Sequence, residues 1–310
     1  MLRFVFGLCM SGLYVTVESW LNDRASNETR GRLLSVYMLV VTLGLGFGQL
    51  LLGIDSPLNA TLFILVGILI SLAVVPVALI RIPAPNATIP VEFSVAALVR
   101  TAPLAVLAVA ISGAVGTTIL ALGAFYATKT GMEPGLVGVF MAASLVGAAA
   151  TQYPLGHLSD RFPRRRVVLA VAAGAVVFAT AAAVLDPGGL WLLALAAAYG
   201  SLAFPMYSLA VSMVNDVIPL IVWSRPAAGI VFVYGVGSVV GPISVSVLME
   251  VLGPVGYFWG LAGFFLPLVV YAFARIIFTA RPKQGRFVSL PYRSSTAAAL
   301  LADPSGDDTL

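Results

Sequence analysis

The sequence has little charge, one cysteine and one histidine. Charged residues make up 10% of the 310 positions and hydrophobic residues 60%, whereas a soluble globular domain carries about 25% charged residues. Such a composition excludes a water-soluble fold. The single Cys9 excludes a disulfide framework, and with His157 as the only histidine no zinc or other metal site is predicted. No catalytic set of side chains stands out, so we predict neither an enzyme nor a cofactor.

Long hydrophobic runs take the place of charge. Runs of about 17 to 25 apolar residues are long enough to cross a bilayer, and helices are expected because open sheet edges would leave backbone groups unpaired in lipid. We therefore predict an all-α membrane protein with nine transmembrane helices. The predicted spans are residues 2–21, 33–53, 59–81, 102–127, 134–154, 166–185, 189–214, 227–250 and 255–279.

Lysine and arginine are distributed unevenly between the connections. If the C-terminal tail and the connections after the first, third, fifth and seventh spans face the cytoplasm, that side holds all of the 17 Lys and Arg except Arg3 and Lys129. This bias follows the positive-inside rule. It predicts a multi-pass protein of the cell inner membrane with its N-terminus outside and its C-terminus in the cytoplasm. The net charge of +4 then reflects topology, and no nucleic-acid partner is predicted.

An internal repeat relates two parts of the chain. Residues 7–48 match the residues 193 positions later, and the matched pairs include Gly7 with Gly200, Asp23 with Asp216 and Gly48 with Gly241. Two related membrane halves are typical of secondary transporters, because a site between two similar bundles can be opened to either side. The repeat also argues against a signal peptide at residues 1–20, since the matching segment lies well inside the chain.

Residues 156–166 carry a more specific signal. They read Gly-His-Leu-Ser-Asp-Arg-Phe-Pro-Arg-Arg-Arg, which resembles the G-x-L-x-D-R-x-G/P-R-R-R loop between the second and third helices of each half in the major facilitator superfamily. The segments at residues 18–22, 30–32 and 152–155 resemble the YcaD-like bacterial branch of that superfamily, and the resemblance extends to about residue 280. It implies a secondary active transporter that moves a small solute by alternating access, as a symporter or antiporter, with protons as the expected coupling ion.

The resemblance also implies a domain order. Counted from the basic loop, the nine spans correspond to helices 4–12 of the family's twelve, so we expect a truncated form in which helices 1–3 are missing. The expected parts are residues 1–81 as the remainder of the N-terminal bundle, 82–101 as a cytoplasmic linker, 102–280 as the six-helix C-terminal bundle and 281–310 as a disordered cytoplasmic tail. The alternative is a truncated membrane protein that does not transport, or an assembly partner. The oligomeric state is not predicted.

The family's basic loop implies a cytoplasmic latch. Gly156 would let helices approach closely, and Asp160 is similar to a residue that meets the positive end of the helix starting near Gly31. An arginine of the loop would pair with Asp216, whereas Asp23 is expected to lack such a partner and to be solvated or turn to Arg30 or Arg32. The arginines at 164–166 could instead serve only to set topology. The predicted gating residues are Gly156, Asp160, Arg161, Arg164, Arg165, Asp216, Asp23 and Arg32.

Polar side chains inside the spans are candidates for the solute or proton path, because they are costly in a membrane. Arg3 is similar to the arginine that begins the family's fourth helix and is associated there with proton coupling, although so near the N-terminus it could also reach the headgroups. Each of the other candidates could instead make a hydrogen bond between helices. The mixture of Tyr, Ser and Gln suggests a small neutral or amphipathic solute. The candidates are Arg3, Tyr14, Glu18, Gln49, Tyr126, Tyr207, Ser212 and Tyr234, with Thr117, Thr118, Ser208 and Ser238 as further lining groups.

Glycines mark predicted contacts between helices, because small residues let helix backbones approach in a membrane. The glycines concerned are Gly44, Gly46 and Gly48 in one span and Gly235, Gly237 and Gly241 in its repeat.

Overall fold

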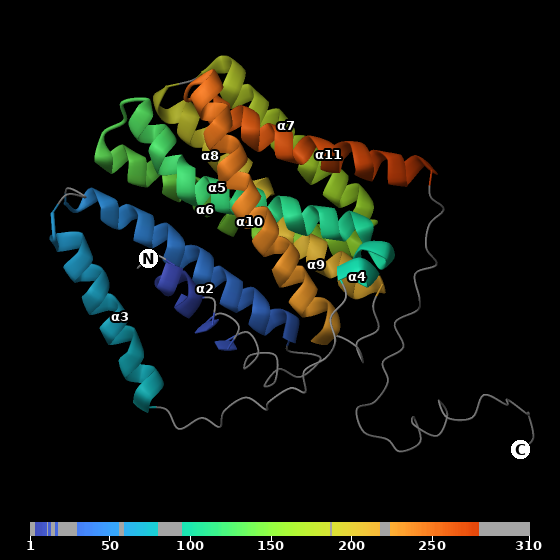
Figure 1. Cartoon of the computed structure of the whole chain (residues 1–310), viewed down its shortest axis with the longest axis horizontal. Helices are drawn as coiled ribbons and strands as arrows, with labels where there is room; N and C mark the ends of the chain where they lie inside the picture. The colour runs from blue at the N-terminus through green and yellow to red at the C-terminus, as the bar shows by residue number, and fades with distance from the viewer. Residues whose placement is uncertain are drawn as a thin grey trace, which may run out of the picture. The chain divides into compact units, whose positions relative to one another are not determined.

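Helices make up the regular structure of the chain in the computed structural model (Figure 1). The structure describes residues 4–10, 12–13, 16–17, 30–55, 59–79, 95–186, 188–217 and 224–278, and within this part there is no strand. The predicted tail and most of the predicted linker lie outside the described residues. In chain order the elements are α2 (Arg30–Leu50), η1 (Leu51–Gly53), α3 (Thr61–Leu79), α4 (Val95–Thr101), α5 (Pro103–Lys129), α6 (Pro134–Arg161), α7 (Arg164–Leu185), α8 (Gly189–Ala203), α9 (Met206–Val217), α10 (Ser224–Leu252) and α11 (Gly256–Phe278).

Seven segments of the described chain are long and apolar enough to cross a membrane, and they correspond to the third through ninth predicted spans. Helix α2 occupies the second predicted span, and residues 4–10, inside the first, are helical. The remainder of the first span lies mostly outside the described residues. The predicted all-α membrane fold is confirmed.

Exposed apolar side chains support a lipid environment. No residue of α3 is buried within the described chain, and α10 exposes a stripe that includes Phe232, Val239 and Val247. In water such surfaces would mark a binding site or an aggregation hazard, whereas a bilayer surrounds them with hydrocarbon.

The predicted linker contains a short helix, α4 (Val95–Thr101), whose Leu98 is buried. The predicted domain boundaries stay a prediction.

The connection between α6 and α7 is shorter than the loop that the sequence suggested. Helix α6 continues through Arg161 and α7 begins at Arg164, so only Phe162 and Pro163 lie between them. A proline disfavours the helical conformation of the residue before it, and Phe162 is extended, with φ −113° and ψ 156°. The basic motif is therefore formed by two helix ends joined by a two-residue elbow, Phe162–Pro163.

The seventh predicted span is divided by a proline. Helix α8 ends at Ala203 and α9 begins at Met206, with Pro205 between them. Because Pro205 has no N–H, it cannot donate to the carbonyl of Ser201 four residues earlier. The Thr151 hydroxyl of α6 donates to that carbonyl instead. A neighbouring helix thus satisfies the backbone group that the proline leaves open.

Glycines let α5 pack against α10 backbone to backbone. A Cβ on Gly113 would overlap the backbone of Tyr234, and a Cβ on Gly237 or Gly241 would overlap the backbone of α5 at Ala110 or Ala114. The predicted contacts at Gly237 and Gly241 are therefore confirmed. The predictions for Gly44, Gly48 and Gly235 are wrong among the described residues, because a Cβ there would meet no described atom within 4 Å, while Gly46 lies near Leu145 of α6.

Candidate solute path and cytoplasmic ion pair

Two of the predicted tyrosines meet between α9 and α10. The ring centroids of Tyr207 and Tyr234 are 5.2 Å apart with an interplanar angle of 73°, an edge-to-face arrangement that aromatic pairs favour. Both side chains are half-buried. The Tyr234 hydroxyl lies against α5 at Gly116, where a Cβ would be 3.5 Å from its oxygen. Three helices therefore define the position of this tyrosine pair.

An amide from α6 reaches the same part of α9. Gln152 Nε2 donates to Ser208 Oγ at 3.3 Å, and the Ser208 hydroxyl donates to the Pro205 carbonyl at 2.8 Å. Gln152 was not among the candidates predicted from the sequence. The cost of placing an amide inside a membrane span could have pointed to it. We call Gln152, Tyr207, Ser208 and Tyr234 the tyrosine–glutamine site.

Other predicted lining hydroxyls are bound to backbone carbonyls. Ser238 Oγ donates to the Tyr234 carbonyl at 3.0 Å and is 3.4 Å from that of Gly113, and Thr118 Oγ1 donates to Ala114 at 2.6 Å. Ser212 is half-buried on α9, four residues after Ser208 and thus on the same face of the helix.

Tyr126 lies apart from the tyrosine–glutamine site. It is 2% exposed, and its ring packs against Phe140, Tyr257 and Phe258 at centroid distances of 5.7, 5.0 and 5.0 Å. Ten residues separate it from Gly116 on α5, which is about 15 Å along the helix axis. The structure therefore places Tyr126 in an aromatic cluster at another depth of the bundle.

Gln49 belongs to the contact between α2 and α6. A Cβ on Gly138 of α6 would be 2.7 Å from the Gln49 carbonyl oxygen, and one on Gly53 would be 3.8 Å from Gly135 Cα. The two helix backbones touch near the beginning of α6. Of the remaining predicted residues, Arg3, Tyr14, Glu18 and Asp23, together with the side chains of Arg32 and Asp160, lie outside the part of the chain that is described.

An ion pair joins the beginning of α7 to the end of α9. Arg164 Nη1 lies 3.2 Å from Asp216 Oδ1, with side-chain exposures of 24% and 53%. The sequence predicted that an arginine of the basic motif would pair with Asp216, and this pairing is confirmed. Partly exposed pairs of this kind contribute up to about 1 kcal/mol to stability. The pair can therefore be broken without unfolding the bundle.

Gly156 does not mediate the close helix contact that the sequence suggested. A Cβ at this position would meet no described atom within 4 Å. The close contacts of α6 are made nearer its beginning, at Gly138 with Gln49 and at Gly147 with Ala197. No close approach is therefore seen at Gly156 among the described residues, and its role in the gate stays a prediction. Of the basic motif's other residues, Arg161 is exposed and Arg165 half-buried.

Comparison with known proteins identifies the class. The sequence pattern of the Major Facilitator Superfamily matches residues 104–302, and the chain belongs to this superfamily. It is 29% identical over 255 residues to YcaD of Salmonella arizonae, described as an uncharacterized MFS-type transporter. It is 28% identical over 255 residues to the YcaD proteins of Salmonella paratyphi B and Salmonella newport.

These alignments cover 80% of this chain and 64% of each relative. The chain therefore spans 64% of the length of the YcaD proteins it matches. The resemblance to the YcaD-like branch that the sequence motifs suggested is confirmed.

Proposed function

We propose that this chain is a secondary active transporter that moves a small neutral or amphipathic solute by alternating access, coupled to protons. Membership of the superfamily and the multi-pass helical fold support membrane solute transport. The observation that carries the proposal is the tyrosine–glutamine site. There α6, α9 and α10 contribute polar side chains beside Gly116 of α5, which has no side chain. Tyrosine offers an apolar ring and a hydroxyl together, which suits a solute with both kinds of surface.

The contacts of α6 suggest how access would alternate. Its backbone touches α2 near Gly138, whereas its other end forms the elbow with α7. We propose that the α2 contact is the pivot and that the elbow end opens and closes toward the cytoplasm. The Arg164–Asp216 pair would hold the ends of α7 and α9 together during this motion. Gly156, Asp160, Arg161, Arg165, Asp23 and Arg32 belong to the same proposed gate.

Reconstitution tests the proposal directly. The purified chain is placed in liposomes containing a pH-sensitive dye, and a panel of neutral and amphipathic solutes is added outside. We expect at least one solute to cause a change in internal pH. Tyr234→Phe removes a hydrogen-bonding group worth about 1 kcal/mol and should slow this flux roughly fivefold. The matched control is Ser244→Ala, because among the described residues the Ser244 hydroxyl bonds only within its own helix, to the Val240 carbonyl.

Three results would contradict the proposal. Solute uptake without any proton movement would exclude proton coupling. A folded chain that responds to no solute would favour the alternative, a membrane protein that does not transport by itself. Equal slowing by Tyr234→Phe and Ser244→Ala would show that the tyrosine–glutamine site is not the solute path.

A further inference from the structure

Two arginines lie at the same end of α7 and α11. Arg165 lies in the first turn of α7 and Arg275 in the last turn of α11, and these two helices pack against each other. Both side chains are half-buried and carry a positive charge. The Nε atom of Arg275 is buried and has no hydrogen-bond partner among the described residues. Within the described part of the chain, neither guanidinium has a carboxylate partner. We call Arg165 and Arg275 the arginine pair.

A pair of like charges that is partly removed from water needs an anion. Burying a charge without a partner is costly, and the first turn of α7 holds no acidic residue that could compensate it. The chain beyond α11 adds more positive charge in sequence, with Arg281, Lys283 and Arg286. The arginine pair is therefore suited to an anionic ligand from outside the described chain.

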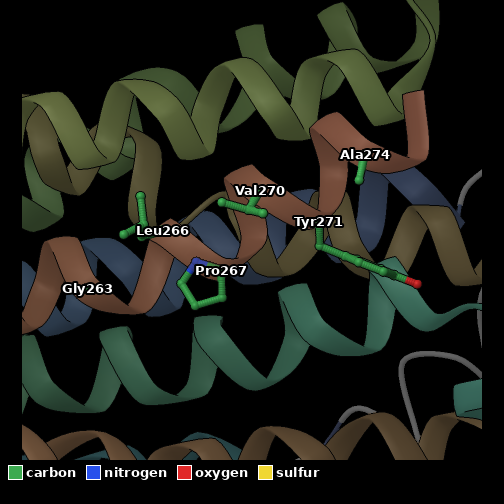
Figure 2. Close-up of a pocket in the computed structure, with 6 residues that line it drawn as sticks. All are labelled: Gly263, Leu266, Pro267, Val270, Tyr271 and Ala274. Carbon is green, nitrogen blue, oxygen red and sulfur yellow. The ribbon is translucent and has the colours of Figure 1, made fainter. Parts of the chain in front are cut away.

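An apolar groove on the surface of α11 ends at Ala274, the residue before Arg275. It has a volume of about 490 Å³ and runs along α11, from Gly263 past Pro267 to Tyr271 and Ala274 (Figure 2). The Tyr271 side chain points away from Gly263, toward the Ala274 end (Figure 2). Tyr271 and Arg275 are four residues apart and share one face of α11.

The groove continues along α11 toward the beginning of that helix. A second hollow of about 450 Å³ lies between α5, α10 and α11 and shares Gly263 and Pro267 with the first. The absence of a side chain at Gly263 keeps this path open, since a Cβ there would meet no described atom within 4 Å. A continuous apolar path thus leads away from a positively charged end.

We propose that the arginine pair and this groove bind one anionic phospholipid. The phosphate would accept hydrogen bonds from Arg165, Arg275 and the Tyr271 hydroxyl, and one acyl chain would lie along Pro267 and Gly263. Arginine matches phosphate geometry through its planar fork of donors, and basic pockets between helices on the cytoplasmic side suit anionic headgroups. A free phosphate would satisfy the arginines but leave the groove empty. This inference does not depend on transport.

Native mass spectrometry of the purified full chain tests the proposal, with phosphatidylglycerol, phosphatidylcholine or inorganic phosphate added to detergent. We expect one phosphatidylglycerol per chain to be retained, and neither of the other probes. The double variant Arg165→Gln/Arg275→Gln should lose at least nine tenths of the bound lipid. Arg100→Gln/Lys129→Gln changes the net charge equally at two exposed residues of α4 and α5 and should retain it. Equal loss in both double variants would overturn the site, because only general attraction would then remain.

A second variant tests the groove without touching the arginines. Gly263→Leu fills the path where space is open, and leucine favours the helix more than glycine does, so the chain should fold. We expect it to retain several-fold less phosphatidylglycerol. Unchanged retention would show that the acyl chain does not lie there. Equal retention of phosphatidylcholine, or thermal stabilisation by inorganic phosphate as large as by phosphatidylglycerol, would each overturn the assignment to an anionic lipid.

Discussion

Three glycines decide how closely α5 and α10 approach. Gly113, Gly237 and Gly241 each face backbone atoms of the other helix, with no room for a methyl group. Between membrane helices, where hydrophobic driving force is absent, such close packing supplies much of the association energy. Substitutions at these positions therefore act on the stability of the bundle, separately from the solute site.

A pair of alanine substitutions tests this at two positions of one helix. Gly237→Ala should destabilise the protein by about 1 to 3 kcal/mol, the usual cost of overpacking, because its Cβ would overlap Ala110. Gly235→Ala meets open space and should be neutral or stabilising by up to about 1 kcal/mol through helix propensity. Thermal unfolding of the purified variants in detergent gives both values. Similar melting temperatures for the two variants would contradict the packing argument.

The glycine pattern predicted some of these contacts and missed others. Small-residue spacing shows which faces permit close approach, and Gly237 and Gly241 make such contacts, whereas Gly235 does not. The rotation of a helix about its axis decides which glycine meets a neighbour, and this depends on residues of the partner helix such as Ala110. The pattern within one helix carries no information about that partner.

At the scale of elements, a proline interrupts the hydrogen bonds of a helix, and a side chain of a neighbouring helix supplies the missing donor. Pro205 leaves the Ser201 carbonyl without its helical donor, and Thr151 of α6 supplies one. The bond therefore couples α6 to the junction of α8 and α9. It lies one residue before Gln152, so it also positions the side of the tyrosine–glutamine site that α6 provides.

A double-variant cycle tests this coupling. Thr151→Val removes the donor and should destabilise the chain by about 0.6 to 1.7 kcal/mol, the range for hydrogen bonds between membrane helices. In a Pro205→Ala background the same change should cost much less, because the backbone N–H at position 205 can then donate to Ser201. Thr128→Val is the control, since the exposed Thr128 hydroxyl bonds only to Ala124 in its own helix. A cost for Thr151→Val that is the same in both backgrounds would refute the coupling.

The elements were predicted well where hydrophobicity marks them and poorly where it does not. Apolar runs predicted the third through ninth spans. They did not predict that α6 continues to Arg161, because a helix that leaves the membrane keeps its backbone hydrogen bonds while its side chains become polar. The division at Pro205 lies inside an apolar run, and its proline was the available signal.

At the scale of the whole molecule, the distribution of charge predicts the orientation in the membrane. Cys9 is the only cysteine, so Cys9→Ser gives a background in which single cysteines can be introduced. We expect Thr130→Cys, between α5 and α6, to react with a membrane-impermeant maleimide in intact spheroplasts. Phe162→Cys, in the elbow, should react only after permeabilisation. The reverse pattern would show that the positive-inside reading is inverted.

The candidate site was predicted in part. Tyr207 and Tyr234 were identified as polar groups inside spans, and the structure brings them together. Gln152 was not predicted, and Tyr126 was predicted to lie on the same path as Tyr207 and Tyr234. Both errors arise because the polarity of a residue shows that it is costly in lipid but gives neither its depth in the bundle nor its neighbours. Those depend on how α5, α6, α9 and α10 are shifted along one another, which only three-dimensional packing fixes.

The elbow has a mechanical consequence. Phe162 and Pro163 span at most about 7 Å, so the end of α6 and the beginning of α7 must stay within that distance of each other. A displacement of the end of α6 by more than this reach would therefore also displace the first turn of α7, which carries Arg165, while Arg275 remains on α11. The distance between the two guanidinium groups would then change as the bundle opens. The affinity of the arginine pair for a lipid headgroup would therefore depend on the conformational state of the protein.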